Sequence, residues 1–219
     1  ATFTYHDVSY TVTKSGKPTC RKGEPKTDIY IAAEDVHRNI AEFKISFKKQ
    51  NADFLENKTN SERAEQLFGA DWENIISNAT LALQDEFLSR ILIYKEKLGR
   101  TDKGAITLGW KFELLNVESG QLSGNMRLSR EQMIDVYAGT NLKGDKRDAF
   151  VNGKQIPFSG VANYILFENT LVQNTQEAID SLIPIEDYVS LHPDVYFACK
   201  ALNYRTFHQK YDGNRPLAV

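Results

Sequence analysis

This 219-residue chain has little cysteine, and its two residues, Cys20 and Cys199, stand far apart. With no Cys-x-x-Cys spacing, they argue against a structural zinc site and for free thiols in a reducing compartment. None of the four histidines stands at a metal-ligand spacing from another, which argues against zinc hydrolases and other chemistry at a histidine-bound metal. A glycine-rich phosphate loop and a nucleophile elbow are missing as well.

Long apolar runs are also absent. No run approaches the ~20 residues that a membrane-spanning helix needs, and the polar alternation of residues 1–5 is not typical of a secretory signal. We therefore expect no membrane partner and a cytoplasmic location. The formal net charge is only −2, while 41% of the residues are hydrophobic. That fraction is enough for one sizeable core and is not typical of a disordered chain.

What the chain does contain is a pair of strand-like runs within residues 22–49. The first run, residues 27–31, is rich in β-branched and aromatic side chains. The second run, residues 41–47, alternates strictly, so that Glu42 and Lys44 point to one face and the apolar side chains point to the other. The polar residues between the runs are typical of a hairpin turn.

The two runs together carry a motif. Asp28 opens the first strand, and Glu42-Phe43-Lys44 lies on the second. This pattern resembles the active-site motif of the PD-(D/E)xK nuclease superfamily, the fold of many type II restriction endonucleases and phage nucleases. In that family an Asp opens one strand and Glu-x-Lys follows on the adjacent strand. Pro25 lies three residues before Asp28 rather than directly before it, and the resemblance covers about residues 22–58.

The resemblance implies a role for each residue of the motif. Asp28 and Glu42 would be metal ligands, the Phe43 carbonyl would be a further ligand, and Lys44 would orient the attacking water or stabilise charge. The metal would be Mg²⁺, with Mn²⁺ as a substitute. The residue types support this chemistry independently, because two carboxylates at one edge form a hard oxygen site suited to Mg²⁺. A lysine on the same face offsets developing negative charge, and Glu24 is the nearest candidate for an additional acid.

A plainer interpretation of the same residues stays open. Glu-x-Lys on an exposed strand face is often only a solvated surface. The surrounding charge favours phosphate binding, since nine basic and five acidic residues lie between Lys14 and Lys49, and phosphate affinity depends on the local face. A second basic loop follows at residues 140–147. The candidate DNA contacts are Lys22, Lys26, Lys48, Lys49, Gln50, Asn51, Lys143, Lys146 and Arg147.

The spacing of apolar residues predicts the remaining elements. Helices are expected at residues 61–68, 71–98, 129–138 and 175–182. Strands are expected at residues 104–115, 162–167 and 194–199, with a hairpin at Asn152-Gly153. We therefore expect an α/β (α+β) fold with a restriction-endonuclease-like mixed central β-sheet flanked by helices. It would form one nuclease-like domain over residues 1–219, with a catalytic core at about 20–115 and a C-terminal α/β extension over 116–219.

Together these expectations predict that the protein is a Mg²⁺-dependent, restriction-type or phage endodeoxyribonuclease. It would hydrolyse double-stranded DNA in the cytoplasm of a prokaryotic or phage-infected cell. Cutting both strands favours a homodimer with two-fold symmetry. Three alternatives stay open. The chain could be a non-catalytic nucleic-acid-binding module of the same fold, a junction resolvase or exonuclease, or a protein-interaction or virion component in which the motif is only surface.

Overall fold

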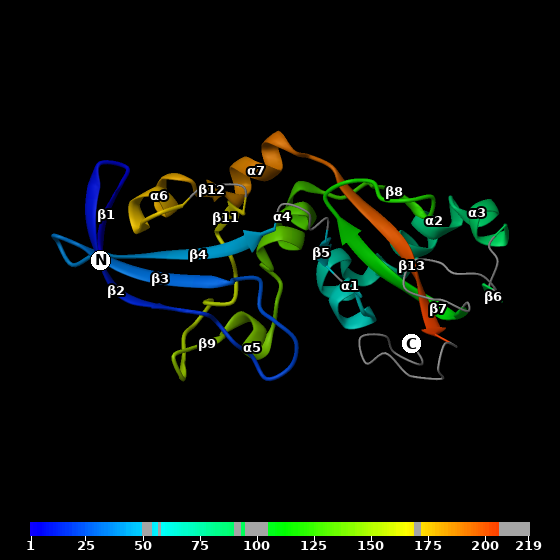
Figure 1. Cartoon of the computed structure of the whole chain (residues 1–219), viewed down its shortest axis with the longest axis horizontal. Helices are drawn as coiled ribbons and strands as arrows, with labels where there is room; N and C mark the ends of the chain where they lie inside the picture. Colours follow the sequence, from blue (N-terminus) through cyan, green and yellow to red (C-terminus); the bar gives the residue numbers. More distant parts are fainter. Residues whose placement is uncertain (50–53, 57, 90–92, 95–104, 169–171, 206–219) are drawn as a thin grey trace. The chain divides into compact units, whose positions relative to one another are not determined.

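The computed structural model describes residues 1–49, 54–56, 58–89, 93–94, 105–168 and 172–205. The chain forms two compact units (Figure 1). The first unit consists of residues 1–52 and 128–193, and the second consists of residues 53–127 and 194–219. Each unit is therefore built from two separate parts of the chain.

The first unit is organised by a mixed sheet in which segments from both parts pair. Its strands are β1 (Thr2–Tyr5), β2 (Val8–Gly16), β3 (Ile29–Asp35), β4 (Ile40–Lys48), β11 (Tyr164–Phe167) and β12 (Ile183–Pro184). They lie in the order β1-β2-β3-β4-β11-β12. Neighbouring strands are antiparallel except β4 and β11, which are parallel. The sheet is thus completed by a strand more than a hundred residues away in sequence.

Each face of this sheet carries a packed cluster of apolar side chains, and the alternation of β4 places its apolar residues on one of these faces. On one face Phe43 and Ile45 pack with Phe3 and with Ile179 of α6 (Thr175–Asp180). On the other face Tyr30 packs in a small cluster with further residues of the same unit. That cluster contains Tyr30, Ala32 and Val151, with Ile156 packed against it. The polar side of β4 is therefore partly enclosed rather than open to solvent.

Shorter elements complete the first unit. They are α4 (Arg130–Ala138), α5 (Gly144–Arg147), the hairpin of β9 (Phe150–Val151) and β10 (Lys154–Gln155), and α7 (Ile185–Leu191). Helix α4 begins with a capping box, in which Ser129 and Gln132 satisfy each other's backbone N–H groups. The hairpin turns at Asn152 and Gly153, both with positive φ, as the Asn-Gly signal predicts.

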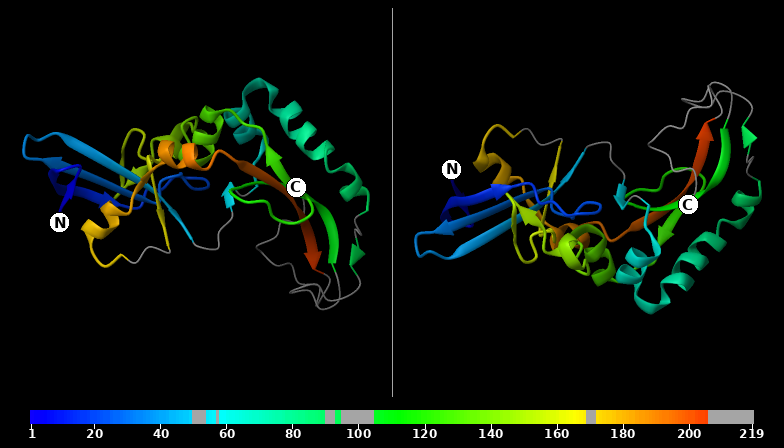
Figure 2. Two further views of the ribbon diagram at one scale, coloured as in Figure 1. Left: turned by 90° about the horizontal axis from the view of Figure 1, so that it is seen from above. Right: turned by 90° about the horizontal axis from the view of Figure 1, so that it is seen from below.

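The second unit is a sheet with helices along one side (Figure 2), and its described strand pairings are antiparallel. Its strands are β5 (Phe54–Glu56), β6 (Ile93–Tyr94), β7 (Ala105–Leu115), β8 (Ser123–Met126) and β13 (Val195–Arg205). Its helical elements are α1 (Ser61–Phe68), η1 (Gly69–Asp71), α2 (Trp72–Leu81) and α3 (Gln84–Leu88). Leu114 and Leu67 are buried in its core, and a largely buried ion pair joins Arg63 to Glu56 (2.8 Å).

The structure confirms the α+β class with a mixed sheet and corrects two finer expectations. The single helix expected at residues 71–98 is wrong, because α2 ends at Leu81 and α3 begins at Gln84. The expected division into a core at about 20–115 and an extension at 116–219 does not match the two units. The physical reason is long-range strand pairing, since β4 pairs with β11 and β7 pairs with β13.

Both cysteines are free, as expected, and burial raises the pKa of the Cys199 thiol to about 11. Among the residues that the structure describes, no helix has the length and apolar character needed to cross a bilayer.

Candidate functional site

Asp28 lies directly before β3 and is tied to the end of β4. Its backbone N–H donates to the Ile45 carbonyl (2.8 Å), and its Oδ2 accepts the Phe47 N–H (2.8 Å). The carboxylate therefore stands where a backbone carbonyl would continue the β3–β4 ladder. It is fixed in place but remains only partly buried.

The electrostatic surroundings of Asp28 are unusual for a surface carboxylate. Burial raises the pKa of this carboxyl above its ordinary value, while the Phe47 N–H and the charges of Lys48 and Lys17 act to lower it. The charge of Glu24 raises the pKa further. A partly buried negative charge is costly until a cation compensates it. Such a perturbed group beside lysines is a candidate for a functional site.

The Glu42 carboxylate is hydrogen-bonded to a tyrosine of β3. The Tyr30 hydroxyl donates to Glu42 Oε1 in a short hydrogen bond, and burial together with this contact raises the pKa of Tyr30. Tyr30 is opposite Lys44 in the strand pairing. The backbone of the motif is also anchored, since Lys44 N–H donates to Asn163 Oδ1 (2.7 Å) and Asn163 Nδ2 donates to the Glu42 carbonyl (2.9 Å). These contacts hold the sheet together.

The strand register does not bring the two expected acidic ligands together. Glu42 is opposite Ala32, whereas Asp28 contacts Phe47, five residues further along β4. Five residues of extended strand span about 16 Å. Two oxygens on one Mg²⁺, each at about 2.1 Å, are at most about 4 Å apart. The backbone positions that carry Asp28 and Glu42 are therefore well separated along β4 in this arrangement.

The Phe43 carbonyl and Lys44 are displaced from Asp28 together with Glu42, because Phe43 is opposite Ile31 in β3. The register therefore separates Asp28 along the strand from the other expected ligands, and their metal-binding roles stay a prediction. The reason for this separation is the hairpin, which fixes the register at the turn between β3 and β4, and a register cannot be read from alternation alone.

A second Phe-Lys pair lies at the position where the structure places Asp28. The strand reads Glu42-Phe43-Lys44 and then, after Ile45, Ser46-Phe47-Lys48. Alternation puts Ser46 and Lys48 on the same face as Glu42 and Lys44. Ser46 is buried, and the charge of Lys48 acts on Asp28. The geometry therefore groups Asp28 with Ser46-Phe47-Lys48 rather than with the Glu-x-Lys segment.

Several oxygen atoms stand near this grouping. In a β-strand the N–H and C=O of one residue point to the same side, so the Phe47 carbonyl leaves β4 on the side of Asp28. Glu24 lies within electrostatic range of Asp28. Within the described residues, no group of three His, Cys, Asp or Glu is close enough to form a metal site. A Mg²⁺ ion needs only one or two carboxylates, because it keeps several waters, and this donor set is compatible with it.

The residues expected to contact DNA differ in their exposure and contacts. Lys22, Lys49 and Lys143 are exposed, whereas Lys26 Nζ donates to the Val136 carbonyl near the end of α4 (2.7 Å) and so supports the fold. Lys48 belongs to the Asp28 grouping. Gln50 and Asn51 lie outside the described residues.

The two basic segments chosen from the sequence lie side by side. Arg21 N–H donates to Asp145 Oδ2 (3.0 Å), and the Arg21 guanidinium is 3.8 Å from the same oxygen. Gly23 lies against the Lys146 side chain. Residues separated by more than 120 positions thus form one surface, which we call the basic surface. Its basic residues are Arg21, Lys22, Lys143, Lys146 and Arg147, and it also includes Asp145 and Asp148, which pair with Arg21 and Arg147.

Sequence reasoning missed the grouping of Ser46 and Lys48 with Asp28, although a signal was present. The Phe-Lys pair occurs twice, four residues apart, and the presence of Glu42 favours the first copy. Choosing the second copy requires the register of β3 on β4.

No family model, no curated protein and no solved structure matches this chain.

Proposed function

We propose that this protein is a Mg²⁺-dependent endodeoxyribonuclease whose site is formed by Asp28 and Ser46-Phe47-Lys48. The observation that carries the proposal is the contact of Asp28 with Phe47, which places a partly buried carboxylate beside Lys48 at the ends of two strands. The basic surface is part of the same unit. Phosphodiester hydrolysis needs both features, a site that holds a cation and a positive surface that binds the DNA backbone.

Each residue of the grouping would have a defined role. Asp28 and the Phe47 carbonyl would hold the ion, with Glu24 as the candidate second carboxylate. Lys48 would orient the attacking water and stabilise negative charge that develops on the phosphate. Ser46 would support Lys48 from the buried layer beneath it. When bound, Mg²⁺ supplies positive charge to the phosphate and activates water.

The partner would be double-stranded DNA, met in the cytoplasm of a prokaryotic or phage-infected cell. Cleavage of both strands would use a homodimer, because a two-fold axis presents one site to each strand. Mn²⁺ would replace Mg²⁺, since it accepts the same oxygen ligands.

Plasmid cleavage by four variants tests the assignment. Wild type, Asp28→Asn, Lys48→Met, Glu42→Gln and Lys44→Met are incubated with supercoiled plasmid, with and without Mg²⁺. We expect Asp28→Asn and Lys48→Met to lose at least about 100-fold in cleavage rate, the usual cost of removing a charge-stabilising group. Glu42→Gln and Lys44→Met, the matched controls on the same strand face, should stay within a few fold of wild type. Full activity of a folded Lys48→Met protein would overturn the grouping.

A second candidate is a nucleic-acid-binding module without catalysis. The observation that favours it is that, in the described part of the chain, no three metal-ligating side chains are grouped. It predicts that wild type retards plasmid DNA but leaves it intact in Mg²⁺ and in Mn²⁺.

A further inference from the structure

One exposed aromatic side chain in the first unit has a conformation that calls for explanation. Phe158 is 52% exposed, and its backbone φ is +55°. This left-handed conformation is disfavoured for any residue with a Cβ, and most of all for a bulky one. Such a conformation persists only where the surrounding structure enforces it, and it is found most often at binding sites.

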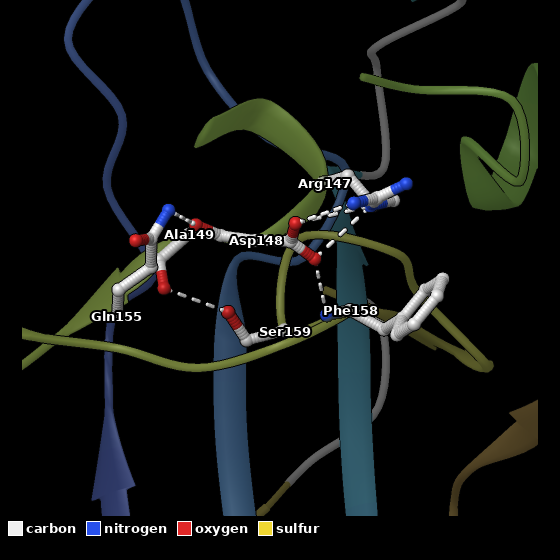
Figure 3. A network of polar contacts seen from close by, with 6 residues as sticks. All are labelled: Arg147, Asp148, Ala149, Gln155, Phe158 and Ser159. Atoms are coloured by element: carbon white, nitrogen blue, oxygen red, sulfur yellow. Dashed lines mark hydrogen bonds and ion pairs between the residues drawn. The ribbon is translucent and has the colours of Figure 1, made fainter. Parts of the chain in front are cut away.

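A network of polar contacts holds Phe158 in this position (Figure 3). Asp148 Oδ1 accepts the Phe158 N–H (2.9 Å), and the same carboxylate pairs with Arg147 (2.7 Å). The Ser159 hydroxyl donates to the Ala149 carbonyl (3.0 Å) and is fully buried. Gln155 donates to the Asp148 carbonyl (2.9 Å). The loop is therefore rigid beneath an aromatic ring that it leaves exposed.

A positively charged side chain lies over the Phe158 ring. The Arg147 guanidinium carbon lies 5.0 Å from the centroid of the Phe158 ring, within the range of a cation–π contact. Arg147 keeps 39% of its side chain exposed. An aromatic ring beside an arginine is the combination with which proteins stack on nucleobases while holding the backbone phosphates.

The loop that presents Phe158 is joined directly to the segment that precedes Asp28. The N–H groups of Lys26 and Thr27 both donate to the Gly160 carbonyl (3.0 and 3.2 Å), and Gly160 N–H donates to the Arg147 carbonyl (2.8 Å). Gly160 packs so closely that an added Cβ would lie 1.8 Å from the Lys146 carbonyl oxygen. Phe158 is thus held in a fixed relation to Asp28 and to the basic surface.

We infer that Phe158, backed by Arg147, stacks on a base that is turned out of the double helix of DNA bound across the basic surface, and so positions the backbone at Asp28. This inference rests on the proposed function for its ligand. The positive charge of the surrounding residues is what identifies DNA as the partner, because an exposed aromatic alone would suit many ligands.

The test is the affinity of four proteins for a 40-base-pair mixed-sequence duplex, measured by fluorescence anisotropy in EDTA so that the DNA stays intact. Phe158→Leu should bind about 5- to 100-fold more weakly than wild type, the range found for loss of one stacked base. Phe158→Tyr should restore the affinity. Ile40→Ala, which also changes an exposed apolar residue of the same unit, should bind like wild type. The slope of affinity against salt should stay unchanged in Phe158→Leu, because the charged side chains that neutralise phosphates are all kept.

The outcomes separate this inference from the proposed function. Unchanged affinity of Phe158→Leu, with wild type that cuts plasmid, overturns the stacking role and leaves the nuclease intact. Wild type that binds the duplex but never cuts removes the nuclease, while the Phe158 comparison still decides the stacking role. Failure of wild type to bind the duplex overturns both.

Discussion

At the scale of single residues, Asp28 combines two demands that conflict. As an acceptor for the Phe47 N–H it fixes the end of the β3–β4 ladder. As a carboxyl whose pKa is raised chiefly by burial, Asp28 has a higher free energy in its charged form than the same group has in water. A residue kept for its backbone contact alone would serve as well without the charge. The charges of Lys48 and Lys17 offset part of this cost, and under the proposed function a bound cation would offset more of it.

This conflict predicts the behaviour of Asp28→Asn. The amide oxygen still accepts the Phe47 N–H, so the fold should be kept. Because the folded-state pKa of Asp28 is raised, its contribution to wild-type stability is fully present below its unfolded value and is lost as pH rises through the folded value. The variant cannot titrate, so its stability relative to wild type should rise between about pH 4 and pH 7. Urea unfolding at the two pH values measures this.

Divalent cation provides the complementary measurement. Binding to the native state alone stabilises a protein, so Mg²⁺ should raise the melting temperature of wild type and leave that of Asp28→Asn unchanged. An equal rise in both proteins would place the ion elsewhere.

The Tyr30–Glu42 contact leads to a different prediction. Tyr30 is buried, and its hydroxyl donates to Glu42, so Tyr30→Phe should lower the free energy of unfolding by about 1–2 kcal/mol. Plasmid cleavage should not change. Tyr10→Phe is the matched control, because Tyr10 packs through its ring against Phe3. A double-mutant cycle with Glu42→Gln should show coupling between the two positions, and purely additive losses would contradict a structural role for Glu42.

At the scale of elements, the parallel pairing of β4 with β11 is extended by a side chain. Before β11 begins, Asn163 continues the ladder by bonding to the backbone of Glu42 and Lys44. Asn163→Ala leaves one N–H and one C=O without these partners, so we expect a loss of about 2–3 kcal/mol in chemical unfolding. Asn39→Ala, in the exposed turn of the β3–β4 hairpin, should cost less than about 1 kcal/mol. Similar losses in both variants would show that Asn163 is not a special anchor.

The elements also show what the sequence alone could predict. Strand β4, the helix that follows Ser129 and the Asn152-Gly153 hairpin follow from local signals, and each is found at the expected place. The sequence between α2 and α3 contains no glycine or proline that would predict the break. The register of β3 on β4 is not a local property either, since alternation fixes faces and leaves the opposite residue undetermined. That is why Asp28 contacts β4 at Phe47 rather than at the Glu42-Phe43-Lys44 segment.

At the scale of the whole molecule, the sheet of each unit includes a strand from a distant, later part of the chain. Strand β11 joins the sheet of the first unit, and β13 joins that of the second. Neither pairing could be deduced from the order of the elements, because contacts between distant segments depend on tertiary packing rather than on sequence neighbours. The same long-range folding brings residues 21–23 against residues 145–146. Two basic segments that look unrelated in sequence thus become one surface.

The basic surface makes a prediction about the molecule as a charged body. The net charge is −2, so under the proposed function DNA affinity would come from this local face and would fall steeply with salt. Removing one lysine that neutralises a phosphate should reduce the slope of log affinity against log salt by about 0.9. The double variant Lys22→Gln/Lys146→Gln should therefore lose close to two units of slope, whereas Lys58→Gln, an exposed lysine of the second unit, should lose none. Anisotropy titrations of the 40-base-pair duplex at several salt concentrations measure the slopes. Equal slopes for all three proteins would mean that DNA binds elsewhere, because counterion release reports every neutralised phosphate regardless of base sequence.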